Sequence, residues 1–212
     1  MKLTVLGATG PTGQIFTAMA LDAGHDVTVL VRNPAKLQSI RVGSKKLNVV
    51  TGDATDAKAV SSVVDGAEVV VSCLGSHPGG PCPMLSIAFR HILAAAARQA
   101  RPPRCVLMTT IGVGGTSFHV KCLLGAFVAG WKVIHDYEKA DALVRAEHGD
   151  VPYVLVRPAH LTDGAGTDKY KLSLSSKGCY HFAMTISRTD VAKFLLRAAC
   201  SPDFDNKAVQ LF

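Results

Sequence analysis

MKLTVLGATGPTG, residues 1–13, is an apolar run that leads directly into three glycines spaced three residues apart. The residues that follow, from Gln14 onward, have helical character. A strand, a glycine turn and a helix in this order expose backbone N–H groups at a helix N-terminus, which carries about half a positive charge. The pattern therefore predicts a cradle for the phosphates of a dinucleotide.

The glycines and threonines of this turn have separate expected tasks. Gly7 allows the tight turn, Gly10 lets the backbone approach the phosphates, and Gly13 lets the helix pack on the sheet. Thr9 and Thr12 can add hydroxyl donors. The spacing Gly-x-x-Gly-x-x-Gly alone is also compatible with a purely structural turn. However, a second strand that ends about 20 residues later favours a nucleotide site.

The composition predicts one domain over residues 1–212, since the chain is 48% hydrophobic and can bury a large core. No signal peptide is visible. The longest apolar segment, residues 122–134, is interrupted by Lys132 and is shorter than the roughly 20 residues that span a membrane. We therefore expect a soluble, cytoplasmic protein without a membrane partner.

The six cysteines form no Cys-x-x-Cys pair and no cluster with histidine, so no metal site is expected. Cys73 and Cys105 lie inside apolar runs, where cysteine acts as a small core residue, and a reducing compartment fits this usage. The net charge of +7 could attract an anionic ligand or could reflect an ordinary basic surface. We expect no nucleic-acid partner, because no motif of that kind is present.

Apolar runs alternate with helix-like stretches along most of the chain, which predicts right-handed βαβ units and a parallel sheet. The expected strands are residues 3–6, 27–31, 47–50, 69–73, 105–109, 154–156 and 209–211. The expected helices are residues 13–22, 57–63, 84–99, 137–146 and 189–199. Residues 112–131 carry five glycines and an apolar patch, and could form a lid, a substrate wall or an oligomer contact.

The end of the second predicted strand bears on the choice of coenzyme. An NAD-preferring site usually carries Asp or Glu there, to hold the ribose 2′-hydroxyl. This chain instead has Arg32, with Lys36 one helical turn further on. Because a guanidinium pairs with a 2′-phosphate and stacks on adenine, we expect a preference for NADPH. The alternative is that Arg32 is simply solvated.

Asp53 and Ala54 follow the third predicted strand. The Asp53 carboxylate can accept a hydrogen bond from the adenine amino group, while Ala54 offers its backbone. Asp53 can also cap the helix that is expected to begin near residue 57, and the two roles are compatible.

Six motifs, read in chain order, carry a resemblance to a known family. They are GATGPTG at residues 7–13, VTVLVRNPAKL at 27–37, GDATD at 52–56, TTIGVG at 109–114, DALVRA at 141–146 and YVLVRPAHLTDG at 153–164. Together they resemble, nearly end to end, the atypical short-chain dehydrogenase/reductases of the NmrA-like NAD(P)H-binding group. Within that group the chain is similar to the biliverdin-IXβ reductase, or flavin reductase, branch. The resemblance implies a three-layer Rossmann fold with a parallel, doubly wound sheet of about seven strands and a small C-terminal part that covers the substrate.

Ligands of open α/β sheets bind beyond the carboxyl ends of the strands. Three segments follow such ends, namely residues 74–77, 109–112 and 157–160. We expect them to converge on the nicotinamide, with Leu74, Gly75, Thr109 and Pro158 against the cofactor.

The catalytic residues are expected from resemblance rather than from a complete motif. No tyrosine has a lysine four residues on, so the Tyr-x-x-x-Lys pair of ordinary short-chain dehydrogenases is absent. By resemblance, Thr110 takes the place of a serine near the nicotinamide, and His160 matches a histidine that borders the substrate. His160 would place the substrate or donate a proton near neutral pH, or it would cap a turn or fill the pocket wall. His77 and Tyr180 are weaker pocket candidates.

These observations favour an NADPH-dependent reductase, active as a monomer or weak homodimer, that acts on a flavin, a quinone or a tetrapyrrole-like small molecule. Two alternatives stay open. One is a non-catalytic NADP(H) sensor of the NmrA-like kind that binds a regulatory partner. The other is a tailoring enzyme, an isomerase or dehydratase, whose pocket is shaped by residues 112–131 and 164–181.

Overall fold

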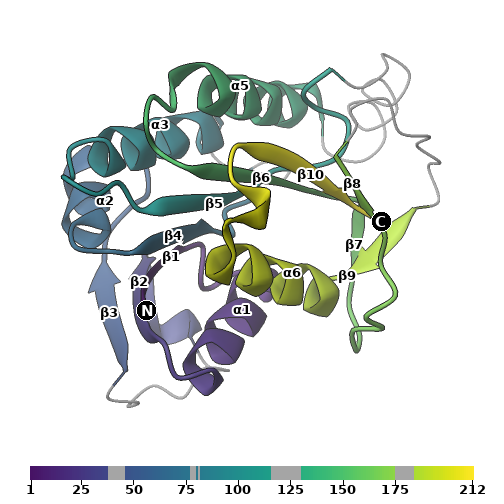
Figure 1. Ribbon diagram of the computed structural model, residues 1–212, viewed down its shortest axis with the longest axis horizontal. Helices are drawn as coiled ribbons and strands as arrows, with labels where there is room; N and C mark the ends of the chain where they lie inside the picture. The colour runs from purple at the N-terminus through teal and green to yellow at the C-terminus, as the bar shows by residue number, and fades with distance from the viewer. Residues whose placement is uncertain (38–45, 77–79, 81, 116–129, 175–183) are drawn as a thin grey trace.

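A central sheet covered by helices on both faces makes up the protein (Figure 1). The computed structural model describes residues 1–37, 46–76, 80, 82–115, 130–174 and 184–212. Within these residues, eight strands lie side by side in the order β3-β2-β1-β4-β5-β6-β10-β8. They are β1 (Lys2–Leu6), β2 (Asp26–Val31), β3 (Leu47–Thr51), β4 (Val69–Ser72), β5 (Arg104–Met108), β6 (Tyr153–Pro158), β8 (Leu172–Ser173) and β10 (Lys207–Leu211).

Seven of these strands are parallel, and they are the seven that the sequence predicts. The eighth, β8, adds antiparallel to β10 through the pairs Gln210↔Ser173 and Leu211↔Leu172, so the expected number of about seven is one too low. A second sheet, also not expected, pairs β7 (His160–Thr162) with β9 (Thr185–Ser187). The predicted α/β Rossmann fold is confirmed.

The helices divide between the two faces of the large sheet (Figure 1). The first face carries α1 (Pro11–Asp22) and α6 (Arg188–Cys200), which pack against each other. The second face carries α2 (Ala57–Val64), α3 (Leu85–Ala96) and α5 (Trp131–Glu147). Two short 3₁₀ turns, η1 (Pro34–Lys36) and η2 (Pro202–Phe204), follow β2 and α6.

Helix α5 begins at Trp131, six residues before the predicted start. Of residues 112–131, positions 116–129 lie outside the described residues.

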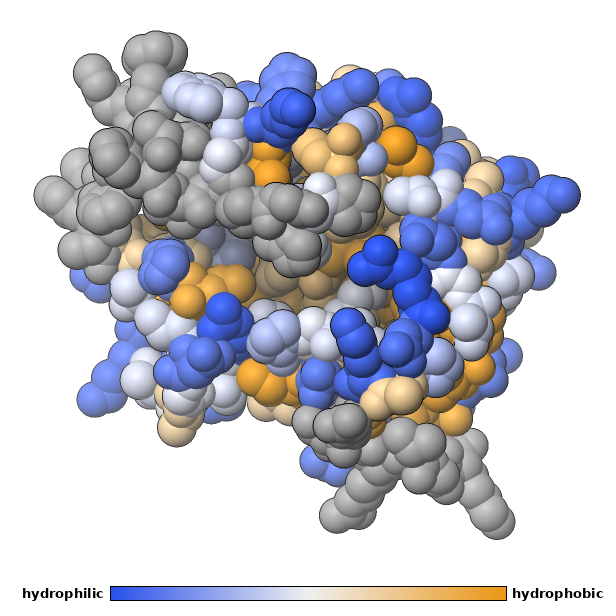
Figure 2. Space-filling view, turned by 180° about the vertical axis from the view of Figure 1, so that it is seen from behind, coloured by the Kyte–Doolittle hydropathy of each residue, from blue (hydrophilic) through white to orange (hydrophobic). Residues whose placement is uncertain are grey.

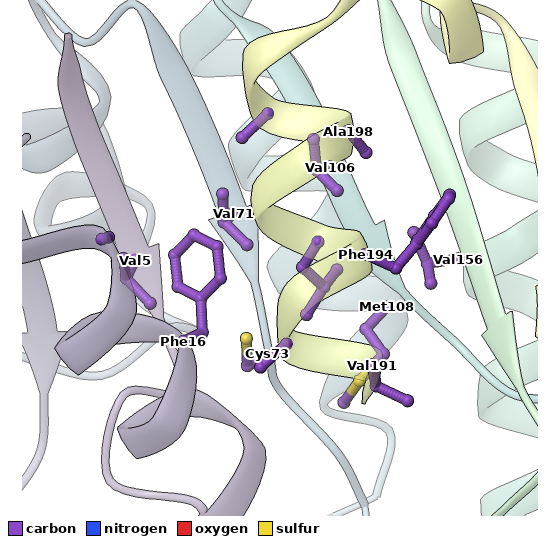
Figure 3. Close-up of a cluster of buried hydrophobic side chains, with 14 of the residues drawn as sticks. Val5, Phe16, Val71, Cys73, Val106, Met108, Val156, Val191, Phe194 and Ala198 are labelled. Carbon is purple, nitrogen blue, oxygen red and sulfur yellow. The ribbon is translucent and has the colours of Figure 1, made fainter. Parts of the chain in front are cut away.

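A buried apolar layer fills each face of the sheet. Figure 3 shows the first, in which Phe16 of α1 lies beside Val5 and Val71, and Phe194 of α6 lies beside the strands β5 and β6. Cys73 belongs to this layer and Cys105 to the opposite one. Burial raises the pKa of both thiols to about 12, so both stay neutral and act as the core residues that their apolar context predicts.

Helix α5 holds the segment between β4 and α3 through a buried carboxylate. The Asp136 carboxylate accepts hydrogen bonds from the backbone N–H groups of Met84, Leu85 and Ser86, and from the Ser86 hydroxyl, at 2.5–3.1 Å. Asp136 thus satisfies the N–H groups that a helix N-terminus leaves without partners. Burial opposes its ionisation, but these hydrogen bonds outweigh that penalty, and the pKa of the carboxyl lies below its ordinary value.

A buried ion pair joins α5 to β6. Asp141 of α5 is fully buried and accepts two hydrogen bonds of 2.8 Å from the guanidinium of Arg157 on β6. Gly114 lies against the same guanidinium, and a Cβ atom there would overlap it. The motifs TTIGVG, DALVRA and YVLVRPAHLTDG, far apart in the sequence, therefore contribute Gly114, Asp141 and Arg157 to a single buried contact.

We expect Asp136→Asn to lower the free energy of unfolding at pH 7 by about 1.5–3 kcal/mol, because hydrogen bonds to a charged group are lost. The folded pKa of Asp136 is lowered, so its stabilisation is complete above the unfolded pKa and disappears as the pH falls through the folded pKa. Urea unfolding at pH 7 and at acid pH should show a smaller loss of stability on acidification in the variant than in the wild type. Asp150→Asn, in an exposed turn, controls for the removed charge. Equal acid slopes in Asp136→Asn and the wild type would contradict the assignment.

Candidate functional site

The strand order reverses around β1, which lies between β2 and β4, and the site occupies the carboxyl ends of the strands at this point. Two hollows lie there. The first, of about 310 Å³, extends from the glycine turn to the ends of β2 and β3. The second, of about 600 Å³, extends from the same turn to the ends of β5 and β6 and to β7. Gly10, Cys73, Gly75 and Ser76 line both hollows, so the two meet at the turn.

The glycine turn is built by close backbone contact. Gly7 has a φ of +81°, and a Cβ atom there would lie 2.7 Å from the carbonyl carbon of Cys73 and from the backbone nitrogen of Leu74. A Cβ atom on Gly13 would overlap the Gly7 carbonyl oxygen. Both glycines are therefore required by packing, Gly7 against β4 and Gly13 against the turn itself.

Gly10 differs from these two glycines. A Cβ atom there would meet only the Gly7 carbonyl oxygen, at 3.4 Å, which is ordinary contact, although Gly10 lines both hollows. It is the N-cap residue of α1, and no side chain caps that helix. The N-terminus of α1 is thus open toward the hollows, the arrangement that binds phosphate. The residues present fit the phosphates of a dinucleotide.

The first hollow contains the residues that the sequence assigns to the adenosine end. Arg32, Asp53 and Ala54 line it, together with Gly7 and Thr9 of the glycine turn. Leu74 and Gly75, which the sequence places near the nicotinamide, line it as well; Gly75 also lines the second hollow, and Leu74 does not. The Asp53 carboxylate accepts hydrogen bonds from the backbone N–H and the hydroxyl of Thr55, at 2.8 and 2.7 Å. These bonds, together with the nearby Arg32 guanidinium, lower the pKa of Asp53, so it is ionised.

The second hollow contains the residues that the sequence assigns to the nicotinamide end and to catalysis. Thr109, Thr110, Pro158 and His160 line it, with apolar walls from β5, α5 and β7, and Thr12 of the glycine turn lines it too. His160 begins β7 and is exposed, and its backbone N–H donates to the Met184 carbonyl at 3.3 Å. Figure 2 shows a face of the molecule hollowed near its middle, with hydrophobic atoms deep in the hollow and hydrophilic atoms around it.

Three expectations need correction or lie outside the described part of the chain. Lys36 ends the 3₁₀ turn η1, is exposed and lines neither hollow. Helix α2 is capped by Asp56, whose carboxylate accepts from the Lys58 N–H at 2.8 Å, and not by Asp53. The weaker pocket candidates His77 and Tyr180 lie outside the described residues.

Tyr137 lines the second hollow although the sequence interpretation assigned it no role in the site, and Ser76, from the segment 74–77 that is expected near the nicotinamide, lines it too. The Tyr137 hydroxyl accepts a hydrogen bond of 3.1 Å from the Ser76 backbone N–H, and burial raises the pKa of the phenol above its ordinary value. The Ser76 hydroxyl is buried without a hydrogen-bond partner among the described residues. Helical spacing could have found Tyr137, because it lies three residues after the buried Ile134 and four before the buried Asp141, on the face that meets the sheet.

Comparison with known proteins agrees with this geometry. The family described as NAD(P)H-binding matches residues 7–202, so the chain belongs to that family. Reductase pytE of Aspergillus terreus is 26% identical to this chain, over 99% of this chain and 97% of its own length. Its name agrees with the expected class, an NAD(P)H-dependent reductase.

Two solved structures share the fold. ChuY of Escherichia coli O157:H7, an anaerobilin reductase, is 23% identical with a TM-score of 0.80, covering 100% of this chain and 97% of its own. A short-chain dehydrogenase/reductase from Veillonella parvula, in complex with NADP, is 18% identical with a TM-score of 0.78, covering 99% of this chain and 93% of its own. Among the described residues, no helix is long and apolar enough to cross a membrane.

We expect Gly10→Ala and Gly13→Ala to separate ligand binding from folding. Gly10→Ala should lower the unfolding temperature only slightly, because the new methyl group has room and only the N-cap preference for glycine over alanine is lost, yet bind NADPH at least about tenfold more weakly, because the methyl group occupies phosphate space. Gly13→Ala should lower the unfolding temperature, because overpacking costs about 1–3 kcal/mol. Thermal unfolding and NADPH titration of both variants check this. Unchanged NADPH affinity in Gly10→Ala would contradict the placement of the phosphates.

Proposed function

We propose that this protein is an NADPH-dependent oxidoreductase that transfers a hydride to a planar acceptor such as a flavin, a quinone or a tetrapyrrole-like compound. The observation that carries the proposal is the meeting of the two hollows at the open N-terminus of α1. A dinucleotide held by its phosphates at that terminus has its adenosine half in the first hollow and its nicotinamide half in the second. The second hollow, at about 600 Å³, also has room for an acceptor ring.

The charges of the first hollow support NADPH over NADH. Arg32 is exposed at the end of β2, where its guanidinium can pair with a 2′-phosphate. The charge of Arg32 helps to lower the pKa of Asp53, and the ionised Asp53 carboxylate can accept a hydrogen bond from the adenine amino group. The neighbouring Veillonella structure contains NADP, which agrees with this preference.

The second hollow would orient the reacting rings. The bound reduced coenzyme supplies the hydride. Met108, Ile111 and Leu161 offer apolar contact for a flat acceptor, and Thr110 and His160 offer polar contact at the same place. Tyr137 and the buried Ser76 hydroxyl would hold the polar edge of the nicotinamide half. Correct orientation alone can lower a barrier by about 7–11 kcal/mol, so little acid catalysis is required for a flavin or quinone-like acceptor.

One observation favours a second candidate, a non-catalytic NADP(H) sensor. The position four residues after Tyr137, where ordinary short-chain dehydrogenases carry a lysine, is Asp141, and that carboxylate is committed to Arg157. Asp141 cannot lower the pKa of Tyr137 as that lysine would, and burial raises it instead. The protein would then bind NADP(H) without oxidising it.

Turnover with a panel of acceptors tests the proposal. We expect the purified protein to oxidise NADPH, followed by absorbance at the NADPH band, when FMN, a quinone or biliverdin is present, and not when all acceptors are omitted. Tight NADPH binding with no oxidation by any acceptor would overturn the reductase and support the sensor or a non-redox enzyme.

We expect Arg32→Asp to reduce the ratio of kcat/KM for NADPH over NADH. Loss of a charge-assisted pair, worth about 1.5–3 kcal/mol, predicts a fall of about tenfold or more. Arg98→Asp makes the same charge change at an exposed residue that lines neither hollow, and should leave the ratio unchanged. If the ratio in Arg32→Asp equals that of the wild type, Arg32 does not bind the 2′-phosphate.

A further inference from the structure

The second hollow combines apolar walls with positive charge and contains no negative charge on its described lining. Its lining includes a guanidinium, on Arg188, and an imidazole, on His160, but no Asp or Glu. Its remaining side chains are uncharged. Most of them are apolar or small, and one is the phenol of Tyr137. A guanidinium in this position binds most strongly to an anionic group of the acceptor.

Arg188 pairs with a carboxylate that is itself almost fully exposed. It begins α6, directly after β9, and its side chain is 23% exposed. Its Nη1 donates a hydrogen bond of 2.6 Å to the Asp163 carboxylate, which is 90% exposed. Because an ion pair with so exposed a partner is screened by water, it contributes little and can yield to a ligand. A guanidinium has five N–H donors in a planar fork, and so can bind an oxyanion with two parallel hydrogen bonds.

The small second sheet separates the backbone positions of Arg188 and His160. His160 of β7 pairs with Thr185 of β9, and Arg188 follows three residues after Thr185. At about 3.3 Å per residue, three residues along a strand span roughly 10 Å. Arg188 therefore lies near one end of this ribbon, while His160 lies near the other, beside Thr110 and Pro158.

We infer that the acceptor is an anion, a planar ring that carries a phosphate or carboxylate group on an arm, and that Arg188 binds this oxyanion. The inference rests on the proposed function and names its substrate class. The ring lies in the apolar part of the hollow near Thr110 and His160, and the oxyanion reaches the guanidinium at the start of α6. The phosphates of the coenzyme already have the open N-terminus of α1 as their partner.

FMN and riboflavin test this directly, because they share one ring system and differ only by a phosphate. We expect the wild type to reduce FMN with a kcat/KM about tenfold above that for riboflavin, since binding a charged oxyanion is worth about that factor. Arg188→Met should abolish this preference by lowering the value for FMN and leaving that for riboflavin unchanged. Arg188→Lys, which keeps the charge, should retain part of the preference, and tests the role if the methionine variant folds poorly.

Arg197→Met is the matched control. It removes a guanidinium from the same helix, at a position that packs over the Phe204 ring at 5.1 Å and lines neither hollow. The control should keep the wild-type ratio of FMN to riboflavin. NADPH affinity, measured by titration, should be the same in all four proteins.

Two outcomes would overturn the inference. One is an equal ratio of FMN to riboflavin in the wild type and in Arg188→Met. The other is a weaker NADPH affinity in Arg188→Met together with an equal loss for both flavins, which would assign Arg188 to the coenzyme. A wild type that oxidises no NADPH with any acceptor contradicts the proposed function instead. Flavin-fluorescence titration of its NADP⁺ complex then decides the inference, which requires FMN to bind more tightly than riboflavin and Arg188→Met to remove the difference.

Discussion

The close backbone approach of the glycine turn to the start of α1 and to the segment after β4 is the constraint on which the rest of the site depends. Helix α1 reaches the turn because Gly13 has no Cβ atom to meet the Gly7 carbonyl, and the turn reaches β4 because Gly7 has none to meet Cys73. Together these contacts hold the N-terminus of α1 at the point where the strand order reverses. A side chain at either glycine would push the helix away from the one position at which its N–H groups face both hollows.

Helix α5 organises the other half of the site in a different way, through side chains instead of close backbone contact. In its first two turns, Asp136 holds the start of α3 and Tyr137 holds the Ser76 N–H, so neighbouring residues fix both ends of the segment that leaves β4. Four residues after Tyr137, on the helix face that meets the sheet, Asp141 binds Arg157 at the end of β6. The carboxyl ends of β4 and β6, which border the second hollow, are thus positioned by one helix.

The sequence was sufficient to predict the seven parallel strands and the glycine turn, because each depends on local pattern. Periodic apolar runs predict strands, and the glycine spacing predicts a turn whatever surrounds it. The strand β8 has two residues and no pattern of its own, so only its pairing with β10 defines it. Arg188 and Tyr137 were missed for a related reason. Each reaches the hollow because of where its helix begins or which face packs on the sheet, and a motif search does not contain that information.

Local pattern also defines the part of the site that dinucleotide-binding proteins share, whereas packing defines the part that is particular to this chain. Phosphates are bound by backbone N–H groups at a helix terminus, and the side chains around them can vary as long as the glycines stay. An acceptor has no such general partner, because it is recognised by whichever side chains line the second hollow. In this chain those are apolar residues together with Arg188 and His160, on a two-stranded ribbon that the α/β fold itself does not require. The identity of the acceptor is therefore decided by that ribbon and the start of α6, where neither the glycine turn nor the sheet order constrains the residues.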